Sequence, residues 1–278
     1  MSVARIEDRS MEQRFFASAL QRLLDARIPF LVGGAYAFER YTGIERHTRD
    51  LDLFVAPEDA PAVLRLFENA GYATEMIYPH WLGKIHDGEA VIDVIFSSGN
   101  GIARVDELWF RHAVSSEVLG VPIRLVPVEE ILWSKAFVME RERFDGADVI
   151  HLLAVFAKKL DWPRLAERFR YHPHVLYAHL LLFSYTYPGL ASHLPGRMMK
   201  ALHRAVESDR VRGRKAPRLC RGTFLSRSQY LSDLSRGFED ARLEPFGAMN
   251  KDEMATWTEA AFREPGTGLP GSPLKPSS

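Results

Sequence analysis

The sequence predicts an α/β fold with a mixed sheet in its first half, followed by a mostly helical region. As far as residue 126, short apolar runs of strand length alternate with segments of helical spacing. Two strand-like runs flank Asp87-Gly88, a strong hairpin signal, so at least one strand pair is antiparallel. From Val128 onward the apolar spacing is helical. Together these features favour a mixed sheet over a doubly wound parallel one.

Local signals place the individual elements. Ser10 is expected to cap the first helix, Gly71 to end the helix that begins at Pro57, and Asp145 to cap a later helix. The expected order is helix 10–27, strand 28–32, helix 35–41, strand 50–55, helix 57–70, strands 74–78, 81–86 and 89–96, helix 105–112, a strand pair about Gly120, and helices over 128–143, 145–160, beyond Pro163 and over 174–190. The strongly apolar segment 174–190 is interpreted as a buried helix.

This order divides the chain into three parts. We expect an α/β domain over 1–126 and a mostly helical region over 127–263. The end, 264–278, is rich in proline, glycine and serine and is expected to be a disordered tail.

Composition excludes several classes of protein. The 36 basic and 36 acidic residues cancel, so no overall charge steers the chain toward nucleic acid or an anionic membrane. The single cysteine, Cys220, excludes an internal disulfide framework and fits a reducing cytoplasm. The N-terminus has charges throughout rather than an apolar signal segment, and 174–190 is too short to span a bilayer. We therefore expect a cytoplasmic protein without membrane contact.

The stretch RHTRDLDLFV places two aspartates in an otherwise apolar strand. Side chains alternate between the faces of a strand, so Asp50 and Asp52 share one face. Two such carboxylates repel unless positive charge lies between them, and a divalent cation is the common solution. An exposed edge strand with solvated acids would show the same pattern, so the motif needs support from its surroundings.

Two further features supply that support. Asp93 lies inside the apolar run VIDVIF, where an unpartnered charge is rare. If its strand lies near the first, three carboxylates converge, enough oxygen for one or two Mg²⁺ ions. Gly33-Gly34, between a strand and a helix, lets the backbone approach a phosphate at a helix N-terminus. The combined pattern predicts a site for a metal–nucleoside triphosphate.

The pattern LVGGAYAF, RHTRDLDLFV and VIDVIF resembles the DNA polymerase β-like nucleotidyltransferase superfamily, in particular its small bacterial branch of aminoglycoside nucleotidyltransferases and AbiEii-type toxins. The resemblance covers about residues 30–96 and, more loosely, the chain to Leu153. It implies a mixed-sheet nucleotidyltransferase fold followed by a helical region. It also implies transfer of a nucleoside monophosphate from an NTP, with ATP as first candidate, to a hydroxyl, with pyrophosphate released.

The resemblance also implies roles for single residues. Asp50, Asp52 and Asp93 would be the catalytic residues and the ligands of Mg²⁺, with Asp93 as a candidate base. The nucleotide would be bound by Gly33, Gly34, Arg49 and Lys135, while Asp145 or Asp148 is similar to a later acidic position of the toxins. Arg46 and Arg49 would either neutralise phosphate or pair with the aspartates. The usual serine after the glycines is replaced by Ala35.

Other functions and partners stay open. The segment from Arg197 to Arg227 holds ten basic residues against two acids, which suits RNA but equally a solvated surface. Because the whole chain is neutral, RNA binding is the minority interpretation. A non-catalytic nucleotide-binding protein on the same fold, or a toxin-like enzyme acting on tRNA, are the alternatives to transfer onto another acceptor.

Overall fold

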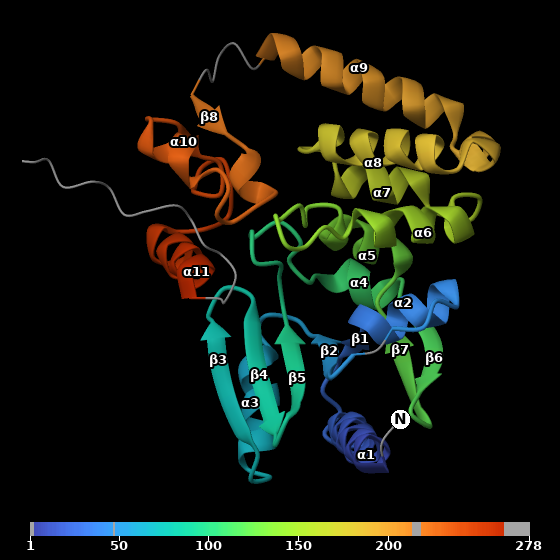
Figure 1. Cartoon of the computed structure of the whole chain (residues 1–278), viewed down its shortest axis with the longest axis vertical. Coiled ribbons are helices and arrows are strands. Elements are labelled where there is room, and N and C mark those ends of the chain that lie inside the picture. Colours follow the sequence, from blue (N-terminus) through green and yellow to red (C-terminus); the bar gives the residue numbers. More distant parts are fainter. Residues whose placement is uncertain (1–2, 47, 213–217, 264–278) are drawn as a thin grey trace, which may run out of the picture.

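The computed structural model describes residues 3–46, 48–212 and 218–263, and their side chains over 11–46, 48–209 and 218–259. It has a seven-stranded mixed sheet and a mostly helical C-terminal region (Figure 1). This confirms the predicted fold class. The predicted tail, 264–278, lies outside the described residues, and the division at residue 126 stays a prediction.

The first half builds the sheet. Its elements are α1 (Val3–Asp25), β1 (Leu31–Val32), α2 (Gly34–Thr42), β2 (Asp50–Phe54), α3 (Ala60–Glu68), β3 (Ala73–Tyr78), β4 (Leu82–Asp87), β5 (Ala90–Ile95), α4 (Glu107–Arg111), β6 (Val114–Val118) and β7 (Val121–Leu125). The strand order is β3-β4-β5-β2-β1-β7-β6. Strand β2 is parallel to β5 and antiparallel to β1, so the sheet is mixed as predicted.

The second half is mostly helical. Its elements are α5 (Val128–Lys135), α6 (Gly146–Phe156), α7 (Trp162–Arg168), α8 (Pro173–Thr186), η1 (Pro188–His193), α9 (Gly196–Arg212), β8 (Leu219–Cys220), η3 (Gly222–Phe224), α10 (Leu231–Ser235), β9 (Glu239–Asp240) and α11 (Lys251–Arg263). Helix α11 contacts β3, so the end of the described chain returns to the sheet edge (Figure 1).

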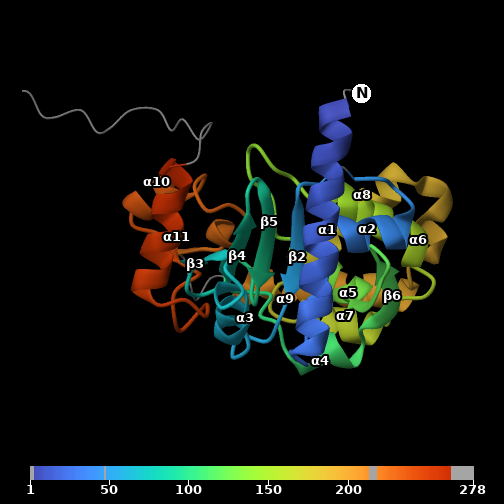
Figure 2. The same ribbon diagram turned by 90° about the horizontal axis from the view of Figure 1, so that it is seen from below.

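The core explains why β2 has two unlike faces. Leu51 and Leu53 on β2, and Ile92 and Val94 on β5, are fully buried. Helix α1 contacts β5 and α3 contacts β3, β4 and β5, and Figure 2 shows α1 running across the sheet beside β2. Because side chains alternate along a strand, the residues between these apolar ones are turned to the other face. Asp50 and Asp52 are therefore directed away from the main core.

The structure corrects the helix predicted over 128–143. Helix α5 ends at Lys135, and the following residues form a turn in which Met139 bridges Phe144. The turn is tied to the C-terminal region, because the Met139 amide donates to the Leu225 carbonyl at 3.0 Å and the Glu140 carboxylate accepts from the Arg227 amide at 2.9 Å. A continued helix would give up both contacts, so tertiary bonds override helical spacing.

Three smaller predictions were wrong in whole or in part. Helix α1 already includes residues before Ser10, so Ser10 is not its cap. Asp145 stands at the cap position of α6, but its side chain makes no capping bond and binds Lys135 and Arg143 instead. Helix α8 is buried on one face only, since Leu181 and Tyr185 are 49% and 86% exposed.

The hairpin between β4 and β5 is confirmed, but its turn lies one residue later than Asp87-Gly88. Asp87 pairs with Ala90, so the loop is Gly88-Glu89, and Gly88 has a φ of 60°. A glycine at the first loop position suits a two-residue turn. The shift changes which residues of the two strands face one another, and this decides the composition of the site.

Among the described helices, none carries an apolar stretch that could cross a membrane.

Candidate active site

A row of charged side chains crosses four neighbouring strands on the face away from the main core. Asp52 on β2 pairs in register with Asp93 on β5, Asp93 with Lys84 on β4, and Lys84 with Glu75 on β3. Directly paired residues have Cβ atoms about 4.5–5.5 Å apart on one face of a sheet. The structure thus places Asp52 and Asp93 side by side, which meets the condition that the sequence analysis set for convergence of the carboxylates.

Asp50 lies two residues before Asp52 on the same face and is held by Thr48. The Thr48 hydroxyl donates to the Asp50 carboxylate, and the Asp50 amide donates back to the Thr48 Oγ1 at 3.3 Å. This reciprocal pair is a local turn that sets the direction of the carboxylate as the chain enters β2. All three predicted carboxylates therefore belong to one face of two adjacent strands.

The two glycines pack directly against this face. A Cβ on Gly34 would stand 1.5 Å from the Asp52 Oδ2, and a Cβ on Gly33 would stand 2.2 Å from the Phe54 ring. Gly34 also has a φ of +53°, which glycine adopts at little cost. The backbone at the start of α2 thus approaches Asp52 as closely as a glycine allows, which brings a helix N-terminus next to the carboxylates.

The environment of Asp52 is short of positive charge. Burial, and then the negative charges of Asp50 and Asp93, raise the pKa of the Asp52 carboxyl to about 7. The charges of Lys135 and Arg143 act in the opposite direction and do not cancel this effect. Such a group is ionised more readily once a cation lies beside it.

Lys135 lies within electrostatic reach of Asp52 but is tied to other carboxylates. Its Nζ is 2.9 Å from the Asp145 Oδ2 and 3.0 Å from the Asp148 Oδ2. The turn after α5 adds Arg143, whose Nε donates to the Asp145 Oδ1 at 3.0 Å. Burial acts to raise the pKa of Asp145, but Arg143 and Lys135 stabilise the charged form. The pKa of Asp145 therefore lies below its ordinary value.

The two arginines that flank the aspartates differ. Arg46 forms an ion pair with Asp148, and its guanidinium lies 4.8 Å from the centre of the Phe38 ring. Arg46 therefore ties the loop before β2 to α6, which is a structural role. Arg49 is exposed and lines a depression with Asp50 and Lys84.

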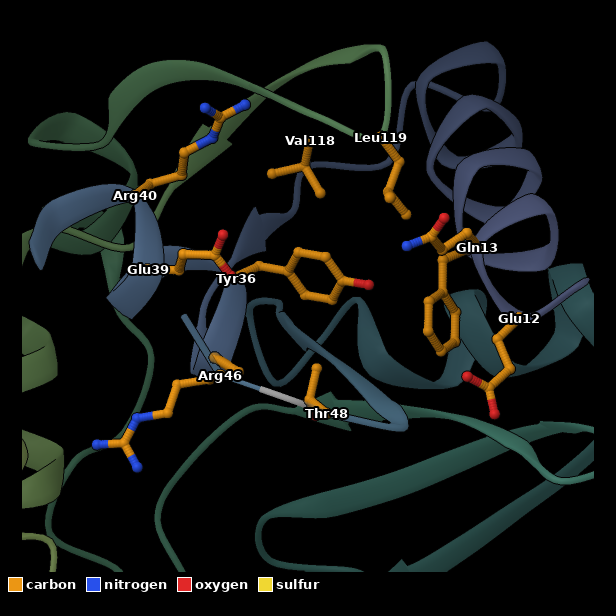
Figure 3. A pocket seen from close by; sticks show the side chains of 11 residues that line it. Glu12, Gln13, Tyr36, Glu39, Arg40, Arg46, Thr48, Val118 and Leu119 are labelled. Atoms are coloured by element: carbon orange, nitrogen blue, oxygen red, sulfur yellow. The ribbon is translucent and has the colours of Figure 1, made fainter. Parts of the chain in front are cut away.

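Two hollows lie on either side of Thr48. One, of about 310 Å³, is lined by Thr48, Arg49, Asp50, Lys84, Glu89 and Val91. The other, of about 330 Å³, lies between α1, α2 and the β6–β7 turn, and Figure 3 shows Tyr36 pointing across it toward Gln13 while Arg46 points away. Both volumes are at the lower end for small-molecule sites. Only the first of them contains one of the three aspartates among its lining residues.

The carboxylates of Asp50, Asp52 and Asp93 suit a hard cation, but they are not arranged as a complete set of metal ligands. Carboxylate oxygens are what Mg²⁺ prefers. Within the described ranges, no three histidine, cysteine, aspartate or glutamate side chains are placed to hold a metal ion together. The Lys84 ammonium instead lies 2.9 Å from the Asp93 Oδ1. Asp50, Asp52 and Asp93 therefore fit the chemistry of the metal, and a bound cation would compete with Lys84 for Asp93.

The basic segment from Arg197 to Arg227 is divided between structural and exposed residues. Arg221 pairs with Asp209, and Arg227 pairs with Glu140 and lies 5.0 Å from the centre of the Trp257 ring. Arg197, Lys200 and Arg204 on α9 are exposed. The side chains of 210–217 lie outside the described residues. RNA binding by this segment stays a prediction.

Sequence reasoning assigned no role to Thr48 and Arg143, and for Lys84, with Trp81 on the predicted hairpin, it suggested only a place in the wall of an acceptor or base pocket. For Lys84 a signal existed, because a two-residue hairpin loop over 88–89 places residue 84 opposite residue 93. For Thr48 the signal was a hydroxyl two residues before an aspartate, a common local turn. Arg143 had no local signal, since the segment around it was interpreted as helix.

The structure thus has a mixed sheet with two aspartates on one strand, a third on the next strand, and a helix N-terminus beside them, the arrangement that the resemblance to nucleotidyltransferases implies. The chain belongs to the family described as "uncharacterised nucleotidyltransferase", which matches residues 3–182, more than half of the chain. It is a nucleotidyltransferase. The prediction of a nucleotidyltransferase is confirmed at the level of this family. No curated protein matches the sequence.

Solved structures with similar folds include three nucleotidyltransferases or related proteins. ANT(2'')-Ia in complex with adenylyl-2''-tobramycin is 19% identical, with 58% of this chain and 99% of that chain covered and a TM-score of 0.42. The lincosamide antibiotic adenylyltransferase LnuA, bound to lincomycin, is 14% identical, with 51% and 96% covered and a TM-score of 0.38. An antigenic nucleotidyltransferase-like protein from Paracoccidioides brasiliensis is 16% identical, with 66% and 91% covered and a TM-score of 0.45. No substrate is inferred from likenesses of this size.

Proposed function

We propose that this nucleotidyltransferase moves a nucleoside monophosphate from an NTP, with ATP as first candidate, to a hydroxyl of an acceptor in the cytoplasm. Asp50, Asp52 and Asp93 would hold Mg²⁺. The observation that carries the proposal is the register of β2 and β5, which sets Asp52 beside Asp93 next to the backbone of Gly34. Carboxylate oxygens that suit a cation and backbone amides that suit a phosphate, close together, support this proposal.

The residues around the aspartates suit a triphosphate. Gly33 and Gly34 bring the backbone at the start of α2 to the carboxylates without a side chain in the way. Arg49 is exposed beside Asp50, where a phosphate could reach its guanidinium. Lys135 would add a point charge, once a phosphate replaces one of its two carboxylate partners.

The reaction that we propose is the one that the resemblance implies. The acceptor oxygen attacks the α-phosphorus of the NTP, the new O–P bond forms as the bond to the β-phosphate oxygen breaks, and pyrophosphate leaves. The acceptor proton passes to a carboxylate, for which Asp93 is our candidate. When bound, Mg²⁺ supplies charge stabilisation at the attacking and leaving oxygens. The chain itself contributes mainly position and electrostatics.

Calorimetric titration of each NTP, with and without Mg²⁺, tests the proposal. Wild type is expected to bind one or more NTPs only with Mg²⁺, and Asp50→Asn/Asp52→Asn is expected to lose that binding. Asp87→Asn is the matched control, because it removes an exposed carboxylate of β4 that is not among the residues lining the hollow. Binding that ignores both metal and the double substitution would exclude the proposed site.

A thermal scan gives a second readout that needs no nucleotide. A cation that binds only the folded state raises the Tm by mass action. Mg²⁺ is therefore expected to raise the Tm of wild type and of Asp87→Asn, and to leave that of the double variant unchanged. An equal rise in all three proteins would place the cation elsewhere.

A further inference from the structure

The ion pair made by Lys84 involves a choice between two carboxylates. Lys84 faces Glu75 on one side and Asp93 on the other, because β4 lies between β3 and β5. Its Nζ contacts the Asp93 Oδ1 at 2.9 Å, and no ion pair with the exposed Glu75 is formed. An ion pair is stronger where less water surrounds it, and the Asp93 side chain is only 16% exposed. Lys84 therefore acts as the internal counter-ion of the third aspartate.

Lys84 also reaches the space where a substrate would lie. It lines the hollow of about 310 Å³ together with Arg49 and Asp50, and its side chain remains 29% exposed. Its backbone belongs to β4, which lies between β3 and β5, while its ammonium group has three rotatable N–H donors. The same group can thus contact Asp93 or a ligand in the hollow.

Lys84 and a bound cation would compete for the same carboxylate. Both would use the oxygens of Asp93, and two positive charges at one carboxylate repel each other. A phosphate next to the cation would offer the ammonium a new partner of the same charge as Asp93. Exchange of one partner for the other keeps Lys84 paired throughout.

We propose that Lys84 is a positioning residue of the reaction, which holds Asp93 before the cation is bound and donates to a phosphate oxygen of the nucleotide afterwards. This inference rests on the proposed function, since it assigns Lys84 a place in the same site. It predicts that Lys84 opposes binding of the cation alone and supports binding of the nucleotide with its cation.

The test begins with titration of Mn²⁺ into the nucleotide-free protein, followed by calorimetry. Lys84→Met removes the competitor for Asp93, so Mn²⁺ is expected to bind about tenfold more tightly than to wild type. Lys84→Arg keeps the charge and adds a fork that suits a carboxylate, so Mn²⁺ is expected to bind more weakly. A merely structural lysine would not produce opposite changes in the two variants.

Three controls isolate the contact. Glu75→Gln removes the other neighbour of Lys84, and Lys158→Met removes an exposed lysine on the C-terminal side of α6. Both are expected to leave Mn²⁺ affinity unchanged. In Lys84→Met/Asp93→Asn the gain in affinity is expected to disappear, because the released carboxylate is gone.

The second arm uses the nucleotide identified by the NTP titration. Lys84→Met is expected to bind the NTP with Mg²⁺ about tenfold more weakly, while Lys84→Arg retains most of the affinity because it still donates to phosphate. Opposite signs in the two arms are the result that supports the inference. Unchanged Mn²⁺ affinity in both Lys84 variants would overturn it, as would tighter binding of both ligands in Lys84→Met.

The two proposals fail in different ways. The proposed function fails if wild type binds no NTP or if Asp50 and Asp52 are not needed for it. The cation arm requires neither nucleotide nor acceptor, so it still decides whether Lys84 competes for Asp93. If Lys84→Met does not fold, the predicted loss of Mn²⁺ affinity in Lys84→Arg decides the question alone.

Discussion

Two clusters of three carboxylates in this protein are surrounded in different ways. The strand cluster, Asp50, Asp52 and Asp93, lies on β2 and β5. The helix cluster, Asp106, Glu129 and Glu130, lies on α5 and at the start of α4. In the helix cluster Glu129 and Glu130 are buried, whereas the Asp106 side chain is 43% exposed. The two clusters differ in how much positive charge the chain supplies to them.

In the helix cluster, two guanidinium groups satisfy all three acids. Arg164 contacts Glu129 at 2.5 Å and Glu130 at 2.6 Å, and Arg168 contacts Glu130 at 3.2 Å and Asp106 at 2.5 Å. Planar forks of this kind match carboxylates in geometry as well as charge. The cluster thus joins α4, α5 and α7 and requires no further ligand.

In the strand cluster the compensation is incomplete. In the part of the chain that the structure describes, one ion pair reaches it, from Lys84 to Asp93. Asp52 keeps a pKa raised to about 7. A structural cluster and a ligand site can therefore contain the same number of acids. What distinguishes them is how much positive charge the chain leaves for a ligand to supply.

The largest expected effect comes from neutralising the strand cluster. Asp50→Asn/Asp52→Asn is expected to lower the rate of nucleotidyl transfer by roughly 10³-fold or more, because several kcal/mol of charge stabilisation would be lost. The Tm is expected to stay equal or rise, since the substitutions remove repulsion. Kinetic and thermal measurements on the same samples check both statements. A clear drop in Tm would show that the cluster is structural after all.

Breaking the helix cluster is expected to have the opposite signature. The Glu130 side chain is 0% exposed, and Glu130→Gln leaves two buried guanidiniums short of charge. The expected cost is about 3–5 kcal/mol in the free energy of unfolding, measured with urea. Glu107→Gln, in an exposed pair with Arg111, is the control and is expected to cost less than about 1 kcal/mol. Equal costs in the two variants would contradict the comparison.

Gly34→Ala sharpens the description of the strand cluster. A left-handed backbone costs a side chain about 1–2 kcal/mol, and here the new Cβ would also displace the carboxylate of Asp52, whose Oδ2 would stand 1.5 Å away. Gly43→Ala has a φ of +71° but no atom within 4 Å, so it measures the backbone cost alone. We expect the free energy of unfolding, measured with urea, to fall by about 1–2 kcal/mol in Gly43→Ala and by more in Gly34→Ala. In calorimetric titration, NTP binding is expected to be lost only in Gly34→Ala. Normal NTP binding in that variant would disconnect Gly34 from the site.

The smallest expected effect concerns pH. Burial acts to raise the pKa of Asp106, but Arg168 stabilises the carboxylate. The pKa of Asp106 therefore lies below its ordinary value. A lowered folded-state pKa contributes stability above the unfolded value of 3.8, and that stability is lost as pH falls further. Asp106→Asn, which can still cap α4, is expected to flatten the decline in Tm between about pH 5 and pH 3. Parallel pH profiles for wild type and variant would show that Asp106 contributes nothing to it.

Local patterns were sufficient for most of the first half. The alternation in β2, the double glycine before α2 and the glycine in the hairpin loop each depend on neighbours in sequence, and the structure has all of these elements. The end of α5 was not predictable in this way. Residues 136–143 have helical spacing, but they form a turn that contacts with Leu225 and Arg227, far away in sequence, help to hold.

The sequence by itself determined that Asp50 and Asp52 share a face, because the period of a strand is two. It also determined that Gly33-Gly34 follow a strand and precede a helix. Only the tertiary structure decided that Asp93 lies beside Asp52 and that Lys84 lies beside Asp93. Strand order and register depend on burying one whole face against α1 and α3, a condition that no single strand contains.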